Sequence, residues 1–387
     1  MKYKNIHTQI THLNVAHKNV LFRIDGNVPV KNNHILDDFR LESVLPILRF
    51  LKEQRARIIV LTHRGRPQGF DEQLSNKILV EWFEKKGFST HFFPDLKVPH
   101  KEMIDASKTD ICLLENLRFF VGEKQNDKMF AQQLAVLGDF YITDAWGVLH
   151  RADASVVQLP RIFPPEKRSV GFLIEKELHG LQPLMKPLHP HVGIFGGGKI
   201  ESKLAALSAL IDTEKIDTVI ICPPLVIPFL PKKISTLTIE DELYQQAGNM
   251  VERAQKKKIA VVLPIDYTVQ QNNRLVTCAA RDMPENTQLI TIGPQTVLLF
   301  TQYIKEAKTL FYSGLMGFLE SPETLAPVHE LFKIIGQTTA YRVGAGGDSV
   351  AAMRQGFTHN FDFLSTGGGS TLAYISDMNL PGLDVFL

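Results

Sequence analysis

The stretch Val-Gly-Ile-Phe-Gly-Gly-Gly-Lys-Ile-Glu-Ser-Lys at residues 192–203 joins an apolar run to a glycine loop and a pair of lysines. The apolar run at 192–195 predicts a strand, and the apolar residues beyond the loop recur at helical spacing (Ile200, Leu204, Leu207 and Ile211). A helix is therefore predicted to begin at the lysines. Cations at that end of a helix oppose its dipole at a cost of about 0.3–1 kcal/mol each. Lys199 and Lys203 thus indicate a bound anion, and phosphate is the usual ligand of bare amides at a helix start.

This stretch almost matches a P-loop, because four residues separate Gly193 from the Gly198-Lys199 pair. A P-loop continues with Ser or Thr, whose hydroxyl binds magnesium. Here the next residue is Ile200, which cannot bind a metal, so the metal ligand must lie elsewhere in the chain. A glycine-rich turn with two solvated lysines is the alternative, and this stretch alone leaves it open.

The composition is that of a soluble globular protein. The chain has 387 residues, of which 44% are hydrophobic and 22% charged, and this length predicts two or three domains. The net charge of +2 argues against a nucleic-acid-binding protein. The N-terminus has no apolar core and is not expected to be a signal peptide. The most apolar stretch, 219–230, is short and contains three prolines, so no membrane span is expected.

The cysteines indicate a reducing compartment. Cys112, Cys222 and Cys278 are scattered and fit neither a disulfide framework nor a metal site. Cys112 and Cys222 lie in apolar runs and are expected to be buried. A cytoplasmic protein is the expectation from this pattern.

The first half of the chain alternates between strand and helix patterns. Apolar runs at 20–24, 58–61, 112–114 and 140–143 predict strands, and amphipathic segments between them predict helices. Such alternation predicts a parallel sheet that is covered by helices on both faces. In open parallel sheets, ligands bind at the carboxyl ends of the strands.

Polar residues gather where these strands end. Asp25, Asn27, His63, Arg66 and Arg118 each follow a strand, and two further arginines lie in the connections (Arg40 and Arg151). Guanidinium groups match the geometry of carboxylate and phosphate bidentately. The set therefore predicts one site for a small, highly anionic ligand with hydroxyls. Any one of these arginines alone would be read as a surface charge, and His63 alone as a structural histidine.

The second half repeats the strand and glycine-loop pattern after a predicted linker helix at 173–188, which the prolines at 183, 187 and 190 are expected to end. Further strands are expected at 218–222, 259–263, 289–292, 310–312, 342–344 and 361–364. Glycine loops at 196–198, 344–347 and 367–369 each run into a helix pattern. Several helix starts at one sheet edge predict a polyphosphate cradle. Asp348 is the candidate magnesium ligand, because magnesium on nucleotide phosphates needs only one or two carboxylates; a plain helix cap is the alternative.

These motifs occur in the order found in the phosphoglycerate kinase family, which the chain resembles over essentially its whole length. The stretches 25–29, 37–40, 63–67, 115–119, 144–147 and 150–152 resemble the family's substrate loops. The stretches 196–203, 314–320, 346–349 and 365–369 resemble its nucleotide loops. The resemblance implies reversible, magnesium-dependent transfer of a phosphoryl group from 1,3-bisphosphoglycerate to ADP, which gives 3-phosphoglycerate and ATP in glycolysis and gluconeogenesis.

The resemblance also implies residue roles. The residues that would bind the glycerate substrate are Asp25, Asn27, Arg40, His63, Arg66, Arg118 and Arg151. The catalytic residues would be Arg40, Lys199 and Lys203. The residues that would bind the nucleotide are Gly196, Lys199, Lys203, Gly314, Glu320, Gly346, Gly347, Asp348 and Ser349. Asp348 would also bind Mg²⁺ together with ATP or ADP.

The expected fold is α/β, with two Rossmann-like parallel-sheet domains of three layers joined by a helical hinge. The N-terminal domain, residues 1–172, would bind 3-phosphoglycerate, and the tail at 375–387 would pack back on it. The helix at 173–188 would link it to a C-terminal nucleotide-binding domain at 189–374. The resemblance implies a monomer that undergoes hinge-bending closure, with small-molecule substrates and neither nucleic acid nor membrane as a partner.

Departures from the family motifs lie in two places. The segments 221–225 and 312–317 lack the family's glycine-rich strand end and its Trp-Asn-Gly-Pro sequence, which leaves the preference for ATP or GTP open and predicts looser base selectivity. In the substrate loops, Gly26, Arg64 and Asp153 replace Phe, Leu and His. A catalytically weakened binding protein is therefore an alternative. A dinucleotide-dependent oxidoreductase fails, because the Gly-Ala-Gly at 344–346 comes late and lacks the third glycine.

Overall fold

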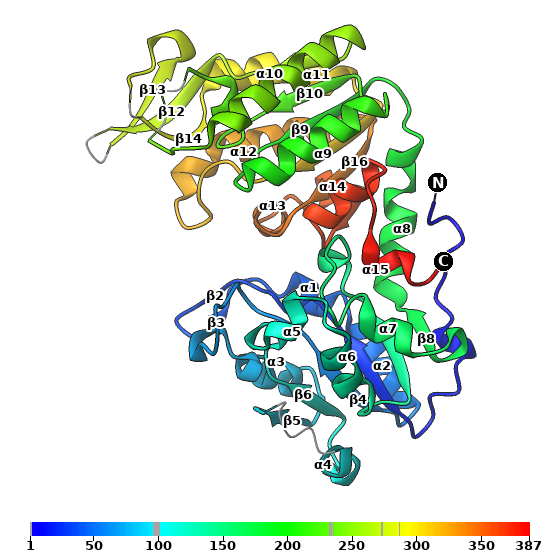
Figure 1. Cartoon of the computed structure of the whole chain (residues 1–387). Coiled ribbons are helices and arrows are strands. Elements are labelled where there is room, and N and C mark those ends of the chain that lie inside the picture. The colour runs from blue at the N-terminus through cyan, green and yellow to red at the C-terminus, as the bar shows by residue number, and fades with distance from the viewer. Residues whose placement is uncertain (1, 96–100, 232–233, 235, 272–273, 286) are drawn as a thin grey trace. The chain divides into compact units, whose positions relative to one another are not determined.

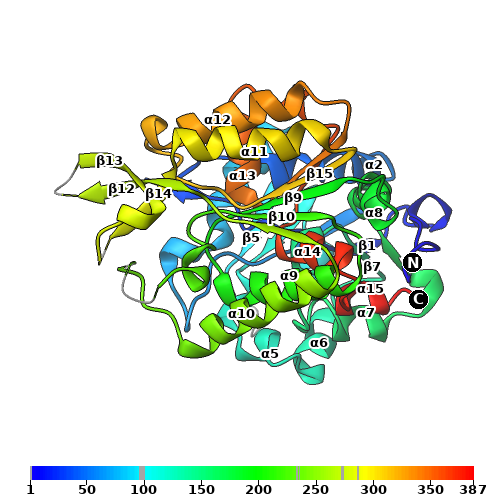
Figure 2. The same cartoon turned by 90° about the horizontal axis from the view of Figure 1, so that it is seen from above.

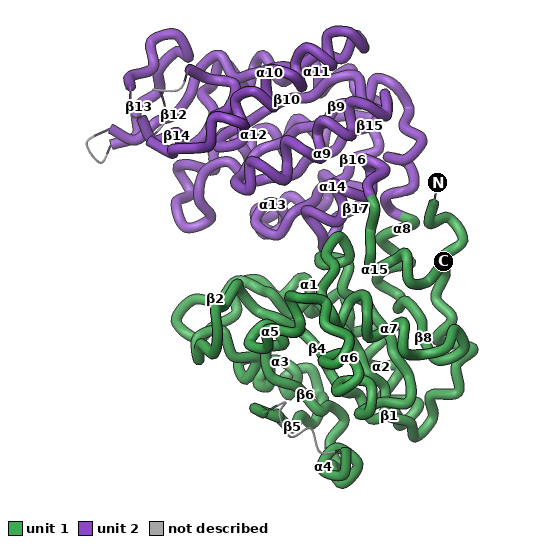
Figure 3. Tube along the Cα trace, viewed as in Figure 1, with its two compact units in different colours: residues 1–179, 379–387 green, residues 180–378 purple. Residues whose placement is uncertain are grey.

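The computed structural model describes residues 2–95, 101–231, 234, 236–271, 274–285 and 287–387. The expected domain ranges include Met1 and the residues between these segments, which lie outside the described residues. The chain divides into two compact units, residues 1–179 with 379–387 (unit 1) and residues 180–378 (unit 2), as Figure 3 shows. The assignment of substrate to one unit and nucleotide to the other stays a prediction at this point.

Unit 1 contains a six-stranded sheet in the order β5-β6-β4-β1-β7-β8, of which Figure 1 labels β4, β5, β6 and β8. All neighbouring strands are parallel, which confirms the predicted sheet type. The strands are β1 (Asn19–Arg23), β4 (Arg57–Leu61), β5 (Thr90–Phe93), β6 (Ile111–Leu114), β7 (Phe140–Thr143) and β8 (Arg168–Val170). Because helices cover both faces, β1, β6 and β7 are buried along their whole length.

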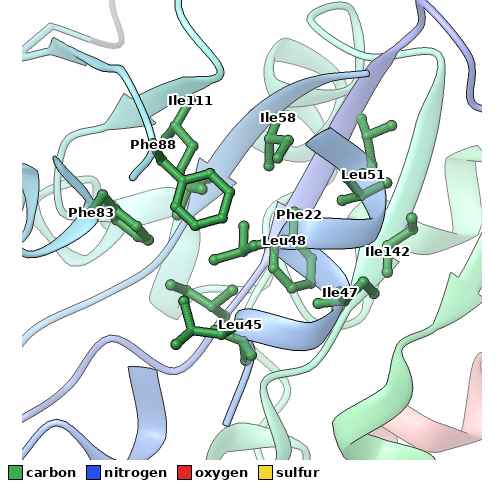
Figure 4. Close-up of a cluster of buried hydrophobic side chains, with 14 of the residues drawn as sticks. Phe22, Leu45, Ile47, Leu48, Leu51, Ile58, Phe83, Phe88, Ile111 and Ile142 are labelled. Carbon is green, nitrogen blue, oxygen red and sulfur yellow. The ribbon is translucent and has the colours of Figure 1, made fainter. Parts of the chain in front are cut away.

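Successive residues of β1 enter different hydrophobic clusters on the two faces of the sheet. Phe22 lies in a cluster with α2 (Leu45–Glu53) and α3 (Leu79–Lys85), and Figure 4 shows it beside Leu48. Leu21 lies in the cluster that includes Phe130 and Leu134 of α6 (Lys128–Ala135). This alternation follows from the two-residue period of a strand. The same second cluster contains Cys112, which is buried as predicted.

The amphipathic segment between the first two predicted strands, which is helical in pattern from about Leu41, forms two helices. α1 (Phe39–Glu42) ends before α2 begins, and Pro46 stands in the first turn of α2. A proline ring clashes with the carbonyl four residues earlier, which here belongs to Glu42, so one continuous helix cannot form. Unit 1 also contains the short helices α4 (Lys101–Ala106), α5 (Val121–Lys124) and α7 (Gln158–Ile162) and the strands β2 (Val30–Lys31) and β3 (His34–Ile35).

Unit 2 contains a second six-stranded parallel sheet, in the order β11-β10-β9-β15-β16-β17. Its strands are β9 (His191–Phe195), β10 (Thr218–Ile221), β11 (Ala260–Val262), β15 (Thr309–Ser313), β16 (Tyr341–Ala345) and β17 (Phe363–Ser365). Figure 2 shows α9 (Ile200–Asp212) and α10 (Asp241–Lys256) on one face and α11 (Pro294–Glu306) and α12 (Pro322–Gly336) on the other. The start of α9 at Ile200 confirms the helix predicted after the lysines.

One expected member of the parallel sheet is wrong. The segment predicted at 289–292 forms β14 (Gln288–Ile292), which pairs antiparallel with β12 (Asp266–Gln271) in a separate three-stranded sheet. β12 also pairs with β13 (Arg274–Ala279). Only two residues separate β12 from β13, so these two strands pair as an antiparallel hairpin, because a parallel pair needs a crossover of a dozen or more residues.

The helix α8 (Phe172–Met185) starts in unit 1 and ends in unit 2. It continues through Pro183, although this proline was expected to end it. A proline so close to the end of a helix removes only one helical hydrogen bond. α13 (Gly347–Met353) and α14 (Gly369–Ile375) follow later in unit 2. The chain then forms α15 (Pro381–Asp384) in unit 1, where Asp384 accepts a hydrogen bond from the Tyr3 hydroxyl at 2.8 Å.

A buried carboxylate lies at the start of α8. Asp144 follows β7, and its Oδ1 accepts a hydrogen bond from the backbone N–H of Ile174 at 3.1 Å. Gly171 leaves room for this carboxylate, because a Cβ there would lie 2.3 Å from Asp144 Oδ2. Burial raises the pKa of Asp144 to about 7, and the nearby Glu177 carboxylate adds to the shift. The ionised form of Asp144 therefore costs folding free energy at neutral pH.

We expect Asp144→Asn to stabilise unit 1 relative to wild type as the pH rises. The pKa of Asp144 is raised in the folded state, so wild type loses stability between its usual value of 3.8 and about 7. The amide has no such loss and can still accept the hydrogen bond from Ile174. The difference in unfolding free energy between the variant and wild type, measured by urea titration, should increase by about 2–4 kcal/mol from pH 5 to pH 8. The exposed Asp282→Asn is the matched control, and an offset that does not depend on pH would contradict the account.

Candidate functional site

The loop after β1 presents Asp25 and Asn27. The Asp25 carboxylate packs against Gly147, where a Cβ would lie only 2.1 Å from Asp25 Oδ2. Asn27 Oδ1 accepts a hydrogen bond from the backbone N–H of Gly65 at 2.9 Å. The loops after β1, β4 and β7 are thus joined at the carboxyl edge of the sheet in unit 1.

Two arginines are held at this edge by backbone carbonyl groups. Arg40, from α1, donates a hydrogen bond to the carbonyl oxygen of Asn27 at 2.8 Å and lies 3.5 Å from Asp25 Oδ2. Arg118 lies in a 3-10 turn after β6 and donates to the carbonyl oxygen of Gly65 at 2.7 Å. Each carbonyl orients its guanidinium group without neutralising the positive charge, and a carboxylate lies near each group, Asp25 beside Arg40 and Asp153 beside Arg118.

His63 is buried among arginines. Its Nδ1 lies 3.2 Å from Nη2 of Arg23, and because a guanidinium can only donate, the ring proton lies on Nε2. Burial lowers the pKa of His63 well below 6.5, and four surrounding arginines lower it further (Arg23, Arg118, Arg151 and Arg40). The imidazole is therefore neutral at physiological pH and offers one N–H donor at this site.

The remaining two predicted substrate residues belong to the same electrostatic cluster. Arg151 is half-buried, and burial lowers its pKa, while the carboxylates of Asp153 and Asp25 oppose that shift. Arg66 is exposed, and its charge lowers the pKa of Arg151. Unit 1 therefore brings all seven predicted substrate residues to one sheet edge.

The sequence reasoning missed Arg23, which is fully buried within β1. Its Nε donates to the hydroxyl of Ser155 at 2.8 Å, and that hydroxyl donates to Glu123 Oε1 at 2.6 Å. Burial raises the pKa of Glu123, and the charge of Arg23 opposes that shift. The available signal was an arginine inside an otherwise apolar strand, since a charged residue in such a run must find a buried partner.

Arg64, one of the departures from the family motif, does not add to the substrate site. Its guanidinium is buried and donates to the carbonyl oxygen of Ser75 at 2.6 Å. Burial lowers the pKa of Arg64, and the Glu115 carboxylate opposes the shift. Glu115 itself accepts hydrogen bonds from Ser75 and Asn76. The Arg64 side chain thus holds the loop between β4 and α3 through its hydrogen bond to Ser75.

In unit 2, the loops after β9, β15 and β16 are also joined. A Cβ on Gly314 would lie 1.9 Å from the carbonyl oxygen of Gly196, and Gly314 has a φ of +107°. Its backbone N–H donates to the Ser349 hydroxyl at 2.8 Å. Only glycine fits at position 314, because a side chain would both clash and strain the backbone.

The two lysines occupy different environments. Lys203 is partly buried, and its ammonium donates to the carbonyl oxygen of Gly196. Burial lowers the pKa of Lys203 to about 8, the Lys199 charge lowers it further, and Asp348 opposes the shift. Lys199 is exposed and precedes α9 in the left-handed conformation, with a φ of +62°. An anion beside both lysines would raise the pKa of Lys203 and favour its charged form.

The glycine loop at 344–347 contacts the glycine loop at 367–369. Gly346 has a φ of +95°, and its backbone N–H donates to the carbonyl oxygen of Gly367 at 2.8 Å. Gly347 and Asp348 open α13 and are exposed. Glu320 is also exposed, and the structure records no hydrogen bond from it to another described residue of these loops. Contacts or charge therefore tie together seven of the nine predicted nucleotide residues, namely Gly196, Lys199, Lys203, Gly314, Gly346, Asp348 and Ser349.

The donor set in unit 2 fits magnesium on a nucleotide phosphate. Within the described segments there is no group of three or more His, Cys, Asp or Glu side chains that could bind a metal alone. Asp348 supplies one exposed carboxylate beside Lys203. One or two carboxylates suffice when phosphate oxygens and water complete the shell.

The departures near 221–225 and 312–317 place bulky side chains under this edge of the sheet. Cys222 is buried, as predicted, and burial raises the pKa of its thiol. The ring of Tyr312 packs edge-on against Phe332, with centroids 5.1 Å apart. The hydroxyls of Tyr312 and Tyr267 are buried without a hydrogen-bond partner in the described parts of the chain.

None of the helices in the described residues has the length and apolar character that a membrane-spanning helix needs.

Comparison with known proteins gives a consistent result. A family described as phosphoglycerate kinase matches residues 10–378. The phosphoglycerate kinase of Aquifex aeolicus is 33% identical over 387 residues, which cover 96% of this chain and 96% of that protein. That of Pseudothermotoga lettingae is 32% identical over 391 residues, covering 97% of each. Among solved structures, phosphoglycerate kinase from Pyrococcus horikoshii has a TM-score of 0.80 at 25% identity, covering 98% of each chain. The enzyme from Coxiella burnetii has a TM-score of 0.75 at 27% identity, covering 97% of this chain and 98% of that one.

We expect Gly314→Ala to damage the joined loops of unit 2. The new Cβ would clash with the Gly196 carbonyl and force a residue with a side chain to a positive φ, so the free energy of unfolding should fall by more than about 2 kcal/mol. Gly248→Ala, in α10, is the control. No atom lies within 4 Å of a Cβ there, and alanine should stabilise that helix by about 0.5–1 kcal/mol. Equal effects of the two variants in denaturant titrations would contradict the close approach of the two loops.

Proposed function

The chain belongs to the phosphoglycerate kinase family, and on that premise we propose that unit 1 binds the glycerate substrate and unit 2 binds the nucleotide. The chain is a phosphotransferase that moves a phosphoryl group reversibly between 1,3-bisphosphoglycerate and ADP, giving 3-phosphoglycerate and ATP, a step of glycolysis. The observation that carries the residue assignment is the cluster of guanidinium groups around the neutral His63.

The substrate assignment follows from charge and hydrogen bonding. A phosphoglycerate carries a phosphate and a carboxylate, and guanidinium groups bind both bidentately. Arg40, Arg66, Arg118 and Arg151 would bind these anionic groups. Asp25, Asn27 and the neutral His63 add hydrogen-bonding groups that a cluster of cations alone lacks, and these suit the substrate hydroxyl.

The nucleotide assignment follows from the joined loops of unit 2. Lys203 and Lys199 supply cationic groups, and the glycines at 196, 314, 346 and 347 allow a phosphate chain to approach the backbone. Ser349 already accepts the Gly314 N–H at 2.8 Å, so it would support the loops more than it would bind the ligand. Asp348 would hold Mg²⁺, which when bound neutralises phosphate charge.

Phosphoryl transfer asks the protein for positioning and electrostatic stabilisation, and not for a covalent intermediate. A carboxylate oxygen of 3-phosphoglycerate attacks the terminal phosphorus of ATP, the bond to ADP breaks, and the reverse reaction returns the group. Arg40 and Lys199 would stabilise the charge on the transferring group. Direct transfer requires the two bound ligands to meet, so we propose closure about α8, which would also exclude water.

The family also supports a cytoplasmic, monomeric enzyme, and we propose both for this chain. A catalytically weakened binding protein is the second candidate, favoured by the bulky residues at 221–225 and 312–317. Retention of Arg40, Lys199, Lys203 and Asp348 favours the active enzyme.

A magnesium-dependent coupled assay with ATP and 3-phosphoglycerate tests the activity. We expect turnover in wild type and a fall in kcat of about 10²–10³-fold in Arg40→Lys, because lysine keeps the charge but not the fork that stabilises the transferring group. Arg253→Lys, an exposed ion-paired residue of α10, is the control for the same chemical change and should match wild type.

Two results would contradict this function. A folded wild type without turnover would favour the binding protein, and an unchanged kcat in Arg40→Lys would remove the role given to Arg40. The same assay with GTP in place of ATP measures the base selectivity, and strong discrimination against GTP would contradict the looser pocket predicted from the altered segments.

A further inference from the structure

A carboxylate stands inside the arginine cluster of unit 1. Asp153 is 3% exposed, and its Oδ2 lies 3.4 Å from Nη2 of Arg118. Its Oδ1 lies 3.7 Å from the ammonium of Lys124. This chain therefore places a negative charge among the guanidinium groups of unit 1.

Asp153 is not what fixes the position of Arg118. The Arg118 guanidinium donates to the carbonyl oxygen of Gly65 at 2.7 Å, which is shorter than its contact with Asp153. The Arg118 backbone N–H donates to Asn116 Oδ1 at 3.1 Å. Loss of the Asp153 charge therefore leaves Arg118 held from two sides. The main effect of Asp153 on this site comes from its charge.

That charge reaches more than one arginine. Asp153 raises the pKa of both Arg118 and Arg151 against the lowering effect of burial. It thus stabilises the two guanidinium groups when no ligand is bound. The same charge repels an incoming anion and competes with it for Arg118. In a buried site this repulsion is weakly screened by salt.

We propose that Asp153 is a built-in counterion of the unit 1 site, which lowers the affinity of that site for phosphoglycerate and other small anions. The inference rests on the proposed function, because it assumes that Arg118 and Arg151 bind the substrate. With Asp153 present, the site binds its anion with lower affinity than the arginines alone would give. This lower affinity favours release of the product after transfer.

Calorimetric titration of 3-phosphoglycerate into the full chain tests this inference. We expect Asp153→Asn to bind 3-phosphoglycerate about tenfold more tightly than wild type, because one repulsive charge is gone. Inorganic phosphate should inhibit that variant at correspondingly lower concentration, and KM for 3-phosphoglycerate should fall without a rise in kcat. Asp153→Glu keeps the charge and should bind within about twofold of wild type. Asp282→Asn, an exposed change of equal charge in unit 2, should not alter the affinity.

The outcomes separate the inference from the function beneath it. Wild type that does not bind 3-phosphoglycerate would overturn the proposed function and this inference together. Wild type that binds, with equal or weaker binding in Asp153→Asn, would overturn the inference alone, because a purely structural role for Asp153 predicts weaker binding. If Asp153→Asn does not fold, Asp153→Ser is measured in its place, and failure of both to fold would also overturn the inference.

Discussion

Mutual repulsion among guanidinium groups is the constraint on which unit 1 depends. Five arginines gather at one sheet edge, four of them around His63, and burial of several of them makes the repulsion stronger. The structure balances this with backbone carbonyl groups, such as those of Asn27 and Gly65, and with buried carboxylates. A bound anion would remove the remaining imbalance, so the fold and the preference for an anionic ligand have the same physical origin.

In unit 2, it is backbone groups of the glycine loops that surround a cationic side chain. Lys203 is partly buried against the Gly196 carbonyl, and its lowered pKa reflects the cost of its desolvation. The loops that surround it approach so closely that Gly314 cannot have a side chain. Both units therefore store unfavourable electrostatic energy at the carboxyl ends of parallel strands, where a phosphate can relieve it.

Local sequence patterns were sufficient for the main strands, the start of α9 and the placement of the substrate arginines, because these depend on short periodic runs and on the topology that such runs imply. They were insufficient where the outcome depended on distant residues. Arg23 looks like any strand residue until Ser155 and Glu123 surround it. The β12–β13 hairpin has exposed apolar residues such as Leu275. The apolar pattern therefore did not show that β14 pairs antiparallel with β12 and not with the parallel sheet. Lys199 and Lys203 looked equivalent in sequence, but the left-handed conformation of Lys199 separates them.

The central claim is that the arginines of unit 1 surround a neutral His63 and form a binding site for an anion. An NMR titration of the His63 ring, with and without 3-phosphoglycerate, tests it most directly. The account predicts no protonation near 6.5 in the free protein, an Nε2–H tautomer, and a higher pKa once the bound anion offsets the arginine charges. An ordinary titration near 6.5 that does not respond to 3-phosphoglycerate would contradict the account.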